Sequence, residues 1–248
     1  MDVTIVICTL KSNERIKALC DYLKPKYEIV VVSPSPIDLA GITILRDAGK
    51  GLAAARNVAL DNIKSDYVLF LGSDNDIDIA DIDLCYAYML DEGWIICAFL
   101  TRYYSVKGYK NRMINKRWRT RFTEGSRSVV GTPCIMAAQY SYGKMGKVHD
   151  IRFNEAMPFS DDSDLCERLT DIDYRVGYSD QYCIDHETDI KARFVMYGKG
   201  DKQYERAYHK NPLRSLLHII KCEWLWSIEY IPFYVYIVYY RLKGYFKG

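Results

Sequence analysis

Acidic residues gather at two places in this 248-residue sequence, and the first directly follows an apolar run at residues 67–71. Asp74 and Asp76 stand one residue apart there, so a turn could direct both carboxylates toward one point. Hard oxygen ligands suit Mg²⁺ or Mn²⁺, which commonly bridge to substrate phosphates. The same residue types also favour a plain turn followed by a helix N-cap. The spacing alone therefore suggests a metal site without being specific for one, and a simple turn accounts for it equally.

The second acidic group lies in the segment that follows Ser160, where Asp161, Asp162 and Asp164 fall within one turn of a predicted helix. A carboxylate at such a site can serve as general base for an acceptor hydroxyl. The structural alternative is that Ser160 caps the helix and the acids favour its macrodipole. A metal site and a base together support a catalytic interpretation more than either group does alone.

The elements that must position these residues follow from the apolar pattern. Short β-branched runs predict strands over residues 3–8, 28–32, 42–45 and 67–71, and helical spacing predicts helices over 13–23 and 52–63. Farther along, a helix is predicted over 160–169 and a strand over 174–178. Strand–helix alternation of this kind predicts an α/β fold with a mostly parallel sheet and helices on both faces. Polar strand ends then meet at the carboxyl edge, where open α/β sheets bind ligands.

Composition narrows the class of protein. The formal net charge of +2 gives no support for nucleic acid as a partner. The eight cysteines form no C-x-x-C pair and no cluster with His, so disulfides and a zinc site are not expected. We expect a reducing, cytoplasmic location instead. The sequence opens without the pattern of a signal peptide. The longest apolar stretch, 224–240, is interrupted by Glu229 and Pro232, so a membrane span is not expected either.

We expect two parts, a catalytic domain at 1–205 and a C-terminal helical segment at 206–248. The segment from 102 to 127 holds nine Lys or Arg residues and one acid, and could bind an anionic acceptor or remain a solvated loop. In the C-terminal part, apolar residues recur at helical spacing among aromatic and basic ones, which favours an amphipathic helix at the cytoplasmic face of a membrane. Packing on the catalytic domain or a homodimer contact are the alternatives. The spaced apolar residues are Leu217, Ile220, Trp224, Ile228 and Ile231.

Several motifs in order resemble the family-two glycosyltransferases of the GT-A fold, over about residues 3–200. The opening strand at 3–9, the Gly49–Asn57 segment with its Ala-Arg-Asn helix start, and the strand end at 70–75 each resemble a family element. So do Phe153-Asn-Glu155, the acidic helix start at 161–169 and Tyr174-Arg-Val-Gly-Tyr178. No single motif is decisive, but five of them in the right order are strong support for the resemblance.

The resemblance implies an inverting transfer of one sugar from a UDP-, GDP- or dTDP-linked donor to an acceptor hydroxyl, with Mg²⁺ or Mn²⁺. It carries the role of base to Asp162, with Asp161 second, and that of metal ligand to Asp74, Asp76 and His186. Lys50 could add a phosphate contact or lie in solvent. The residues that the resemblance places at the donor are Thr9, Glu14, Ser33, Gly51, Arg56, Asn57, Ser73 and Asp74.

Two positions depart from the family pattern. The family usually ends its second strand with Asp residues that help to hold the base, whereas this sequence has Ser33 there. The first Asp of the metal motif falls on Gly72. A non-catalytic sugar-nucleotide-binding relative is therefore one alternative.

A second alternative comes from Gly49-x-Gly51-x-x-Ala54, which matches the dinucleotide fingerprint of a Rossmann oxidoreductase. That fingerprint usually follows the first strand, and an oxidoreductase would leave the second acidic group without a function. A P-loop NTPase is excluded because the sequence has no G-x-x-x-x-G-K-[ST] segment.

Overall fold

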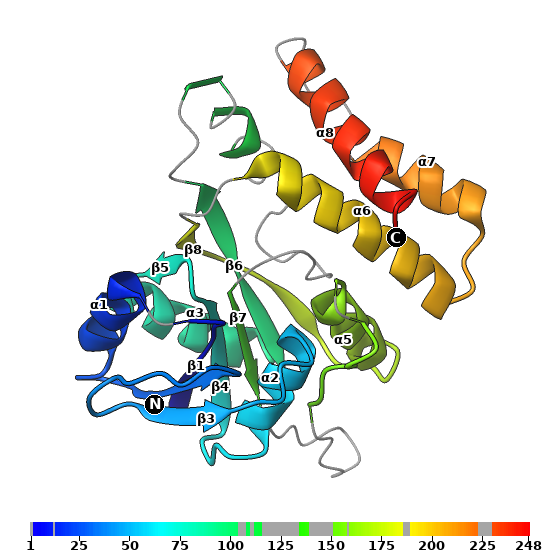
Figure 1. Cartoon of the computed structure of the whole chain (residues 1–248). Helices are drawn as coiled ribbons and strands as arrows, with labels where there is room; N and C mark the ends of the chain where they lie inside the picture. Colours follow the sequence, from blue (N-terminus) through cyan, green and yellow to red (C-terminus); the bar gives the residue numbers. More distant parts are fainter. Residues whose placement is uncertain are drawn as a thin grey trace.

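The computed structural model describes residues 2–11, 13–103, 108–109, 112–115, 134–138, 151–157, 159–185, 189–222 and 230–248. A central sheet is flanked by helices, and three long helices lie together on one side of it (Figure 1). The strands are β1 Val3–Cys8, β2 Glu28–Ser33, β3 Thr43–Arg46, β4 Tyr67–Gly72, β5 Asn75–Ile77, β6 Ile96–Tyr103, β7 Ile135–Ala138 and β8 Val176–Asp185. The helices are α1 Glu14–Leu23, α2 Leu52–Leu60, α3 Ile79–Glu92, α5 Asp161–Thr170, α6 Ile190–Ala207, α7 Pro212–Cys222 and α8 Ile231–Tyr245.

The sheet has the strand order β3-β2-β1-β4-β7-β6-β8-β5. The pairs β1–β2, β1–β4, β2–β3 and β6–β8 are parallel, while β5 and β7 pair antiparallel with their neighbours. In this register Cys8 at the end of β1 lies opposite both Val32 and Gly72. The carboxyl ends of β1, β2 and β4 therefore form one edge, which confirms the predicted α/β class.

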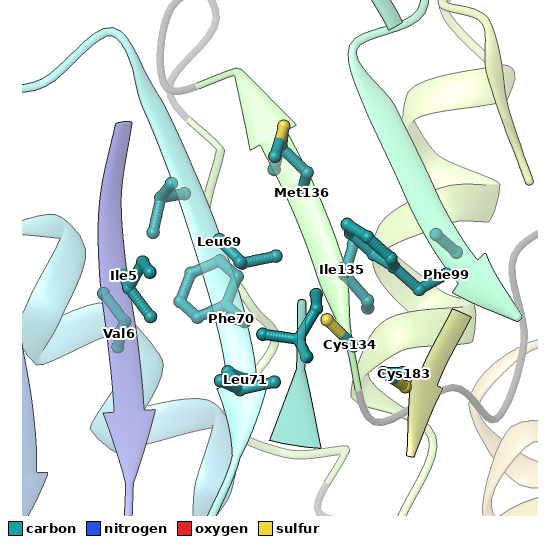
Figure 2. Packing of buried hydrophobic residues seen from close by; sticks show 14 of the residues in the cluster. Ile5, Val6, Leu69, Phe70, Leu71, Phe99, Cys134, Ile135, Met136 and Cys183 are labelled. Atoms are coloured by element: carbon teal, nitrogen blue, oxygen red, sulfur yellow. The ribbon is translucent and has the colours of Figure 1, made fainter. Parts of the chain in front are cut away.

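The core explains why the first strands read as continuous apolar runs. Neighbouring residues of a strand point to opposite faces, yet Ile5, Val6 and Ile7 are all at most 1% exposed, so both faces of β1 are covered. Figure 2 shows part of this core, in which side chains of β1 and β4 approach those of β7 and Phe99 of β6. Such packing fixes the strand ends that carry the polar residues.

Helix α8 packs lengthwise on α6 through two glycines, so the C-terminal segment adjoins the rest of the chain (Figure 1). A Cβ atom at Gly244 would overlap the carbonyl oxygen of Val195, and one at Gly198 would overlap that of Arg241. Arg241 also binds Asp201 of α6 through two hydrogen bonds of 2.6 and 2.8 Å. The expected domain boundary at 205/206 falls in the last turn of α6. None of the helices in the described ranges has the length and hydropathy that a membrane-spanning segment needs.

We expect Gly244→Ala to lower the free energy of unfolding by about 1–3 kcal/mol, because the added methyl meets a backbone carbonyl that can move only with its helix. Urea unfolding followed by circular dichroism measures this loss. Val235→Ala on the exposed face of the same helix is the matched control, expected within about 0.5 kcal/mol of wild type. Equal stability of the two variants would contradict the close α6–α8 packing.

Candidate active site

The edge formed by β1, β2 and β4 collects several of the predicted donor-site residues. The backbone N–H of Thr9 donates to the Val32 carbonyl at 2.9 Å, which ties the end of β1 to β2. Ser33 is fully buried, and its hydroxyl oxygen accepts a hydrogen bond of 3.1 Å from the Ser35 N–H. Ser73 and Asp74 form the partly exposed turn after β4. The sequence-predicted residues on these three strand ends are therefore neighbours along one edge.

A cavity of about 390 Å³ opens between the start of α1 and the loop after β2. Glu14, which the resemblance places at the donor, is exposed and lines it. The helix contributes Asn13, Glu14 and Lys17, and the loop contributes Asp38, Leu39 and Ala40. Because this loop continues from β2, the cavity adjoins the edge that carries Ser33.

The structure gives a physical reason for glycine at position 72. A Cβ atom there would overlap Oδ1 of Asn75 and would lie 2.9 Å from Oδ1 of Asp74. Asn75 thus fills the space that the first acidic side chain of the family motif would need. Its side-chain N–H donates to the Ile184 carbonyl at 3.4 Å, while its Oδ1 is buried without a hydrogen-bond partner. Two side-chain oxygens, one charged and one neutral, therefore lie near the same point above β4.

Asp76 has a different environment from Asp74. Its Oδ1 accepts a hydrogen bond of 2.9 Å from Arg15 of α1, and the pair is about one-third to one-half exposed. Among the side chains that the structure describes, no group of three or more His, Cys, Asp or Glu could hold a metal ion. His186 lies outside the described residues. The described residues thus place Asp74, and not Asp76, beside a second oxygen that lacks a partner.

The glycine-rich segment leads into α2 with two residues in the left-handed region, Gly49 at φ +67° and Gly51 at φ +117°. Gly51 is the N-cap, and a Cβ there would meet nothing within 4 Å, so the backbone angle, and not crowding, accounts for glycine. Lys50 between them is exposed. The segment follows β3 and not β1, which is the wrong place for a Rossmann dinucleotide fingerprint.

Arg56 and Asp161, 105 residues apart, form a buried ion pair between α2 and α5. The Arg56 Nη1 donates to Asp161 Oδ2 at 2.7 Å, and the two side chains are 7% and 9% exposed. The Arg56 guanidinium also lies over the rings of Phe70 and Phe153, 5.5 and 4.9 Å from their centroids. Sequence reasoning places Arg56 at the donor and Asp161 second as base, and the structure pairs these two side chains with each other.

Asn57 joins α2 to the segment before α5 in the same way. Its Oδ1 accepts from the Phe153 N–H at 2.8 Å, and its Nδ2 donates to the Phe153 carbonyl at 2.9 Å. A third bond, of 3.1 Å, runs from Nδ2 to Glu155. Asn57 thus holds the Phe-Asn-Glu segment against the helix that begins at the glycine-rich loop.

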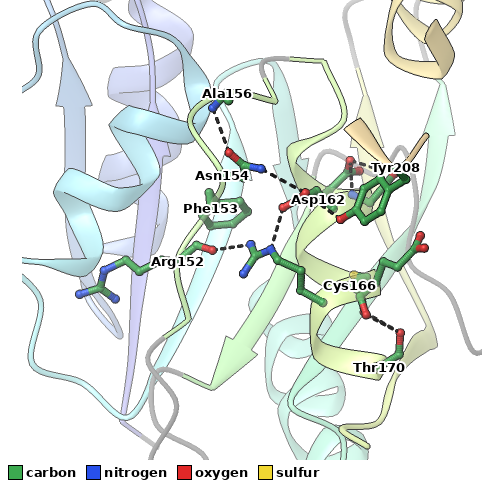
Figure 3. A network of polar contacts seen from close by, with 12 residues as sticks. Arg152, Phe153, Asn154, Ala156, Asp162, Cys166, Thr170 and Tyr208 are labelled. Carbon is green, nitrogen blue, oxygen red and sulfur yellow. Dashed lines mark hydrogen bonds and ion pairs between the residues drawn. The ribbon is translucent and has the colours of Figure 1, made fainter. Parts of the chain in front are cut away.

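The three acids at the start of α5 have distinct surroundings. Asp164 is 1% exposed and accepts hydrogen bonds from Arg168, Tyr208 and Asn154 at 2.8, 2.9 and 3.3 Å, part of the network in Figure 3. Burial, with the hydrogen bond to Asp164, raises the pKa of Tyr208 to about 12, so its hydroxyl remains a donor. Asp162 is only partly buried, and its Oδ1 accepts from the Ser163 N–H at 2.8 Å. Of the three, Asp162 is the acid that reaches the surface.

The two acidic groups of the sequence lie near each other in space. Burial raises the pKa of the Cys8 thiol to about 12; Arg56 lowers it in part, and Asp47 and Asp161 add to the rise. Cys8 is paired with Gly72 at the end of β4, and Arg56 joins α5 to β4 because it binds Asp161 and also lies over Phe70. A protonated thiol there is a poor nucleophile.

Sequence reasoning missed Asp47, which directly follows β3 at this same edge. Its N–H donates to the Ser33 carbonyl at 3.3 Å, and its Oδ1 is buried without a hydrogen-bond partner. The sequence carried one signal: Asp47 is the acid nearest to the glycine-rich segment. Only the pairing of β2 with β3 places it beside Ser33, where the family pattern has its missing Asp.

Comparison with known proteins adds independent support. The family model described as glycosyl transferase family 2 matches residues 4–151. The mannosyltransferase PcManGT from Pyrobaculum calidifontis, solved with GDP-Man and Mn²⁺, has a TM-score of 0.63 at 15% identity, over 98% of this chain and 70% of that one. No curated protein matches.

Two further solved structures share the fold. TarS 1–349 from S. aureus, in complex with UDP-GlcNAc, has a TM-score of 0.55 at 14% identity, covering 99% of this chain and 89% of that one. Glucosyl-3-phosphoglycerate synthase from Mycobacterium tuberculosis has a TM-score of 0.54 at 12% identity, over 82% and 79%. At these identities the likeness shows the fold alone, which is GT-A. Because the family model spans more than half of the chain, this protein belongs to glycosyl transferase family 2 and is a glycosyltransferase.

Proposed function

We propose that this glycosyltransferase moves a sugar from a nucleotide-diphosphate donor to an acceptor hydroxyl with inversion, and that Asp162 is its base. The observation that supports this most is the contrast among the three acids of α5. Asp161 and Asp164 are 6% and 1% exposed, whereas Asp162 next to them is only partly buried. A carboxylate that reaches solvent beside the edge formed by β1, β2 and β4 can contact an acceptor hydroxyl.

In the proposed step, the Asp162 carboxylate accepts the proton of the acceptor hydroxyl as that oxygen forms a bond to the anomeric carbon. The bond from this carbon to the diphosphate breaks on the opposite face, and the nucleoside diphosphate leaves with the bonding electrons. One base suffices, in contrast to the paired carboxylates of a glycosidase. The ion pair between Arg56 and Asp161 anchors the first turn of α5 and so positions Asp162.

A divalent metal fits the residues at the end of β4. Mg²⁺ and Mn²⁺ are typically held by one or two protein oxygens together with substrate phosphates and water. Asp74 would hold the ion, and the unpartnered Oδ1 of Asn75, near the same point, would supply a second, neutral oxygen. Such an ion would neutralise the charge of the leaving diphosphate. Asp76 would remain with Arg15. His186, the further ligand that the family resemblance implies, lies outside the described residues.

Donor recognition would fall to the edge of β1, β2 and β3. The buried Oδ1 of Asp47 can accept a hydrogen bond from a base N–H or a ribose hydroxyl. The hydroxyl oxygen of nearby Ser33 already accepts a hydrogen bond from the Ser35 N–H. Thr9, Glu14, Gly51 and Ser73, which the family resemblance assigns to the donor, would contribute to the same site. The related structures hold different nucleotides, GDP-Man in PcManGT and UDP-GlcNAc in TarS, so the base is a matter for experiment.

Calorimetric titration with UDP-, GDP- and dTDP-sugars, with and without Mn²⁺, tests the proposal. We expect one donor to bind only with metal, and Asp74→Ala to weaken it by at least about tenfold, because a charged hydrogen-bonding or ligand group is lost. Asp66→Ala is the matched control, since Asp66 is exposed at the opposite end of β4. Equal binding by Asp74→Ala and wild type would overturn the metal assignment. No binding of any donor would overturn the donor class.

A further inference from the structure

Helix α8 has an outer face that is apolar along its whole length. Its buried face includes Phe233, Ile237 and Gly244, which pack toward α6. The side chains on the opposite face recur at spacings of four, four and seven residues, which places them on one side of a helix. They are Ile231, Val235, Tyr239 and Phe246, exposed by 42%, 59%, 58% and 72%.

Helix α7 repeats the pattern. Its inward side chain Ile219 is fully buried, while Leu213, Leu217 and Ile220 are exposed at spacings of four and three. The two helices pack against each other and lie on the outer side of α6, away from the β3 edge of the sheet (Figure 1). Exposed apolar side chains that recur along one face of each of two adjacent helices indicate an interaction surface.

This outer face cannot turn inward to bury itself. The close contacts at Gly198 and Gly244 leave no room for α8 to rotate, since rotation would drive a side chain of one helix into the backbone of the other. The buried bidentate pair of Arg241 with Asp201 fixes the same orientation. The apolar face of α8 is therefore held outward by its own packing.

Charge identifies the kind of partner. Neither α7 nor α8 contains Asp or Glu, whereas Arg214, Lys243 and Lys247 lie on or next to them. Residues 206–248 carry seven Lys or Arg and two acids, a net charge of +5, while residues 1–205 carry 27 and 30, a net charge of −3. The positive charge of the chain is thus concentrated in the segment that presents the apolar faces.

We propose that the outer faces of α7 and α8, with these basic residues, bind the surface of a membrane that contains anionic lipid. An amphipathic helix lies in such an interface with its apolar side chains among the acyl chains and its Lys and Arg at the headgroups. A second copy of the chain fits less well, because a symmetric contact would bring two segments of +5 together. The proposal is independent of the catalytic assignment.

Sedimentation of the full chain with vesicles tests the proposal, using phosphatidylcholine alone and phosphatidylcholine with phosphatidylglycerol. We expect binding to the anionic vesicles that weakens with salt, and a loss of at least about tenfold in the double variant Val235→Glu/Tyr239→Glu. The control Leu84→Glu/Leu90→Glu changes two side chains of α3 that are 54% and 50% exposed, and should bind as wild type does. Circular dichroism confirms that each variant is folded.

The outcomes separate the partners. Binding to both vesicle types that both double variants retain would overturn the assignment of this surface. If the wild type were a monomer that bound no vesicles, the proposal of membrane binding would be overturned. If the wild type were a dimer that bound no vesicles, and if Val235→Glu/Tyr239→Glu dissociated it, the partner of this surface would be a second copy of the chain and not a membrane. Metal-dependent donor binding should persist in every variant, so this test and that of the proposed function can fail separately.

Discussion

Replacing Asp162 by Asn should lower the rate of sugar transfer by about 10²–10⁴-fold, the range that a positioned general base contributes. The amide keeps the shape of the side chain and can still accept the 2.8 Å hydrogen bond from the Ser163 N–H, so α5 should remain in place. Donor affinity should change little, because the lost group acts on the acceptor. Initial rates with the donor identified by calorimetry, together with the donor Kd, measure both effects.

Glu167→Gln is the matched control for Asp162→Asn. It removes one negative charge from the same helix, five residues on, where Glu167 lies 3.4 Å from Lys210. We expect nearly wild-type rates for this variant. If Asp162→Asn were as active as wild type, Asp162 would not be the base. If both variants lost activity to the same extent, the charge of the helix as a whole, and not Asp162 in particular, would be what matters.

The first half of the sheet could be predicted closely from the sequence. Strands predicted at 3–8 and 67–71 are observed at Val3–Cys8 and Tyr67–Gly72. These strands are buried on both faces, so nearly every residue is apolar and the signal is strong. The helix predicted at 160–169 is observed at Asp161–Thr170, because the acids of its first turn mark the start clearly.

Helix α6 could not be predicted in the same way. It contains Gly198 and Gly200, which disfavour a helix by about 1 kcal/mol each relative to Ala. Their reason lies elsewhere in the chain: Gly198 admits the backbone of α8, and a Cβ at Gly200 would lie 2.5 Å from the Ser160 hydroxyl oxygen. Tertiary packing therefore outweighs local propensity here. The tail likewise forms two described helices, α7 and α8, with Leu217 and Ile231 of the predicted stripe on different ones.

The site shows the same division between local and non-local information. The residues alone placed three acids on one helix turn, and only the family resemblance ranked Asp162 before Asp161. Their different burial could not be predicted, because the partners Arg56 and Tyr208 lie 105 and 44 residues away. In the sequence, glycine at position 72 suggested that the first Asp of the metal motif had been lost. In the structure it is a packing requirement of Asn75, three residues on.

Replacing Asp161 by Leu should lower the free energy of unfolding by about 3–5 kcal/mol, because it leaves the Arg56 guanidinium buried without its counter-charge. Arg56 is 6% exposed and enclosed by Phe70 and Phe153, so water cannot easily replace the carboxylate. Urea unfolding of the variant measures the loss. Glu92→Gln provides the comparison, since it breaks a pair with Arg175 in which the side chains are 36% and 61% exposed, and should cost at most about 1 kcal/mol.

The double variant Arg56→Met/Asp161→Leu distinguishes charge from shape. Two apolar side chains of similar size remove both charges at once, and buried pairs replaced in this way are often as stable as the original. We therefore expect the double variant to be more stable than Asp161→Leu alone, although it lacks one more native side chain. Transfer should remain impaired in it, because the guanidinium–carboxylate bond that orients the first turn of α5 is gone and Asp162 is held less firmly. Full activity in a stable double variant would show that the pair stabilises the fold without positioning the base.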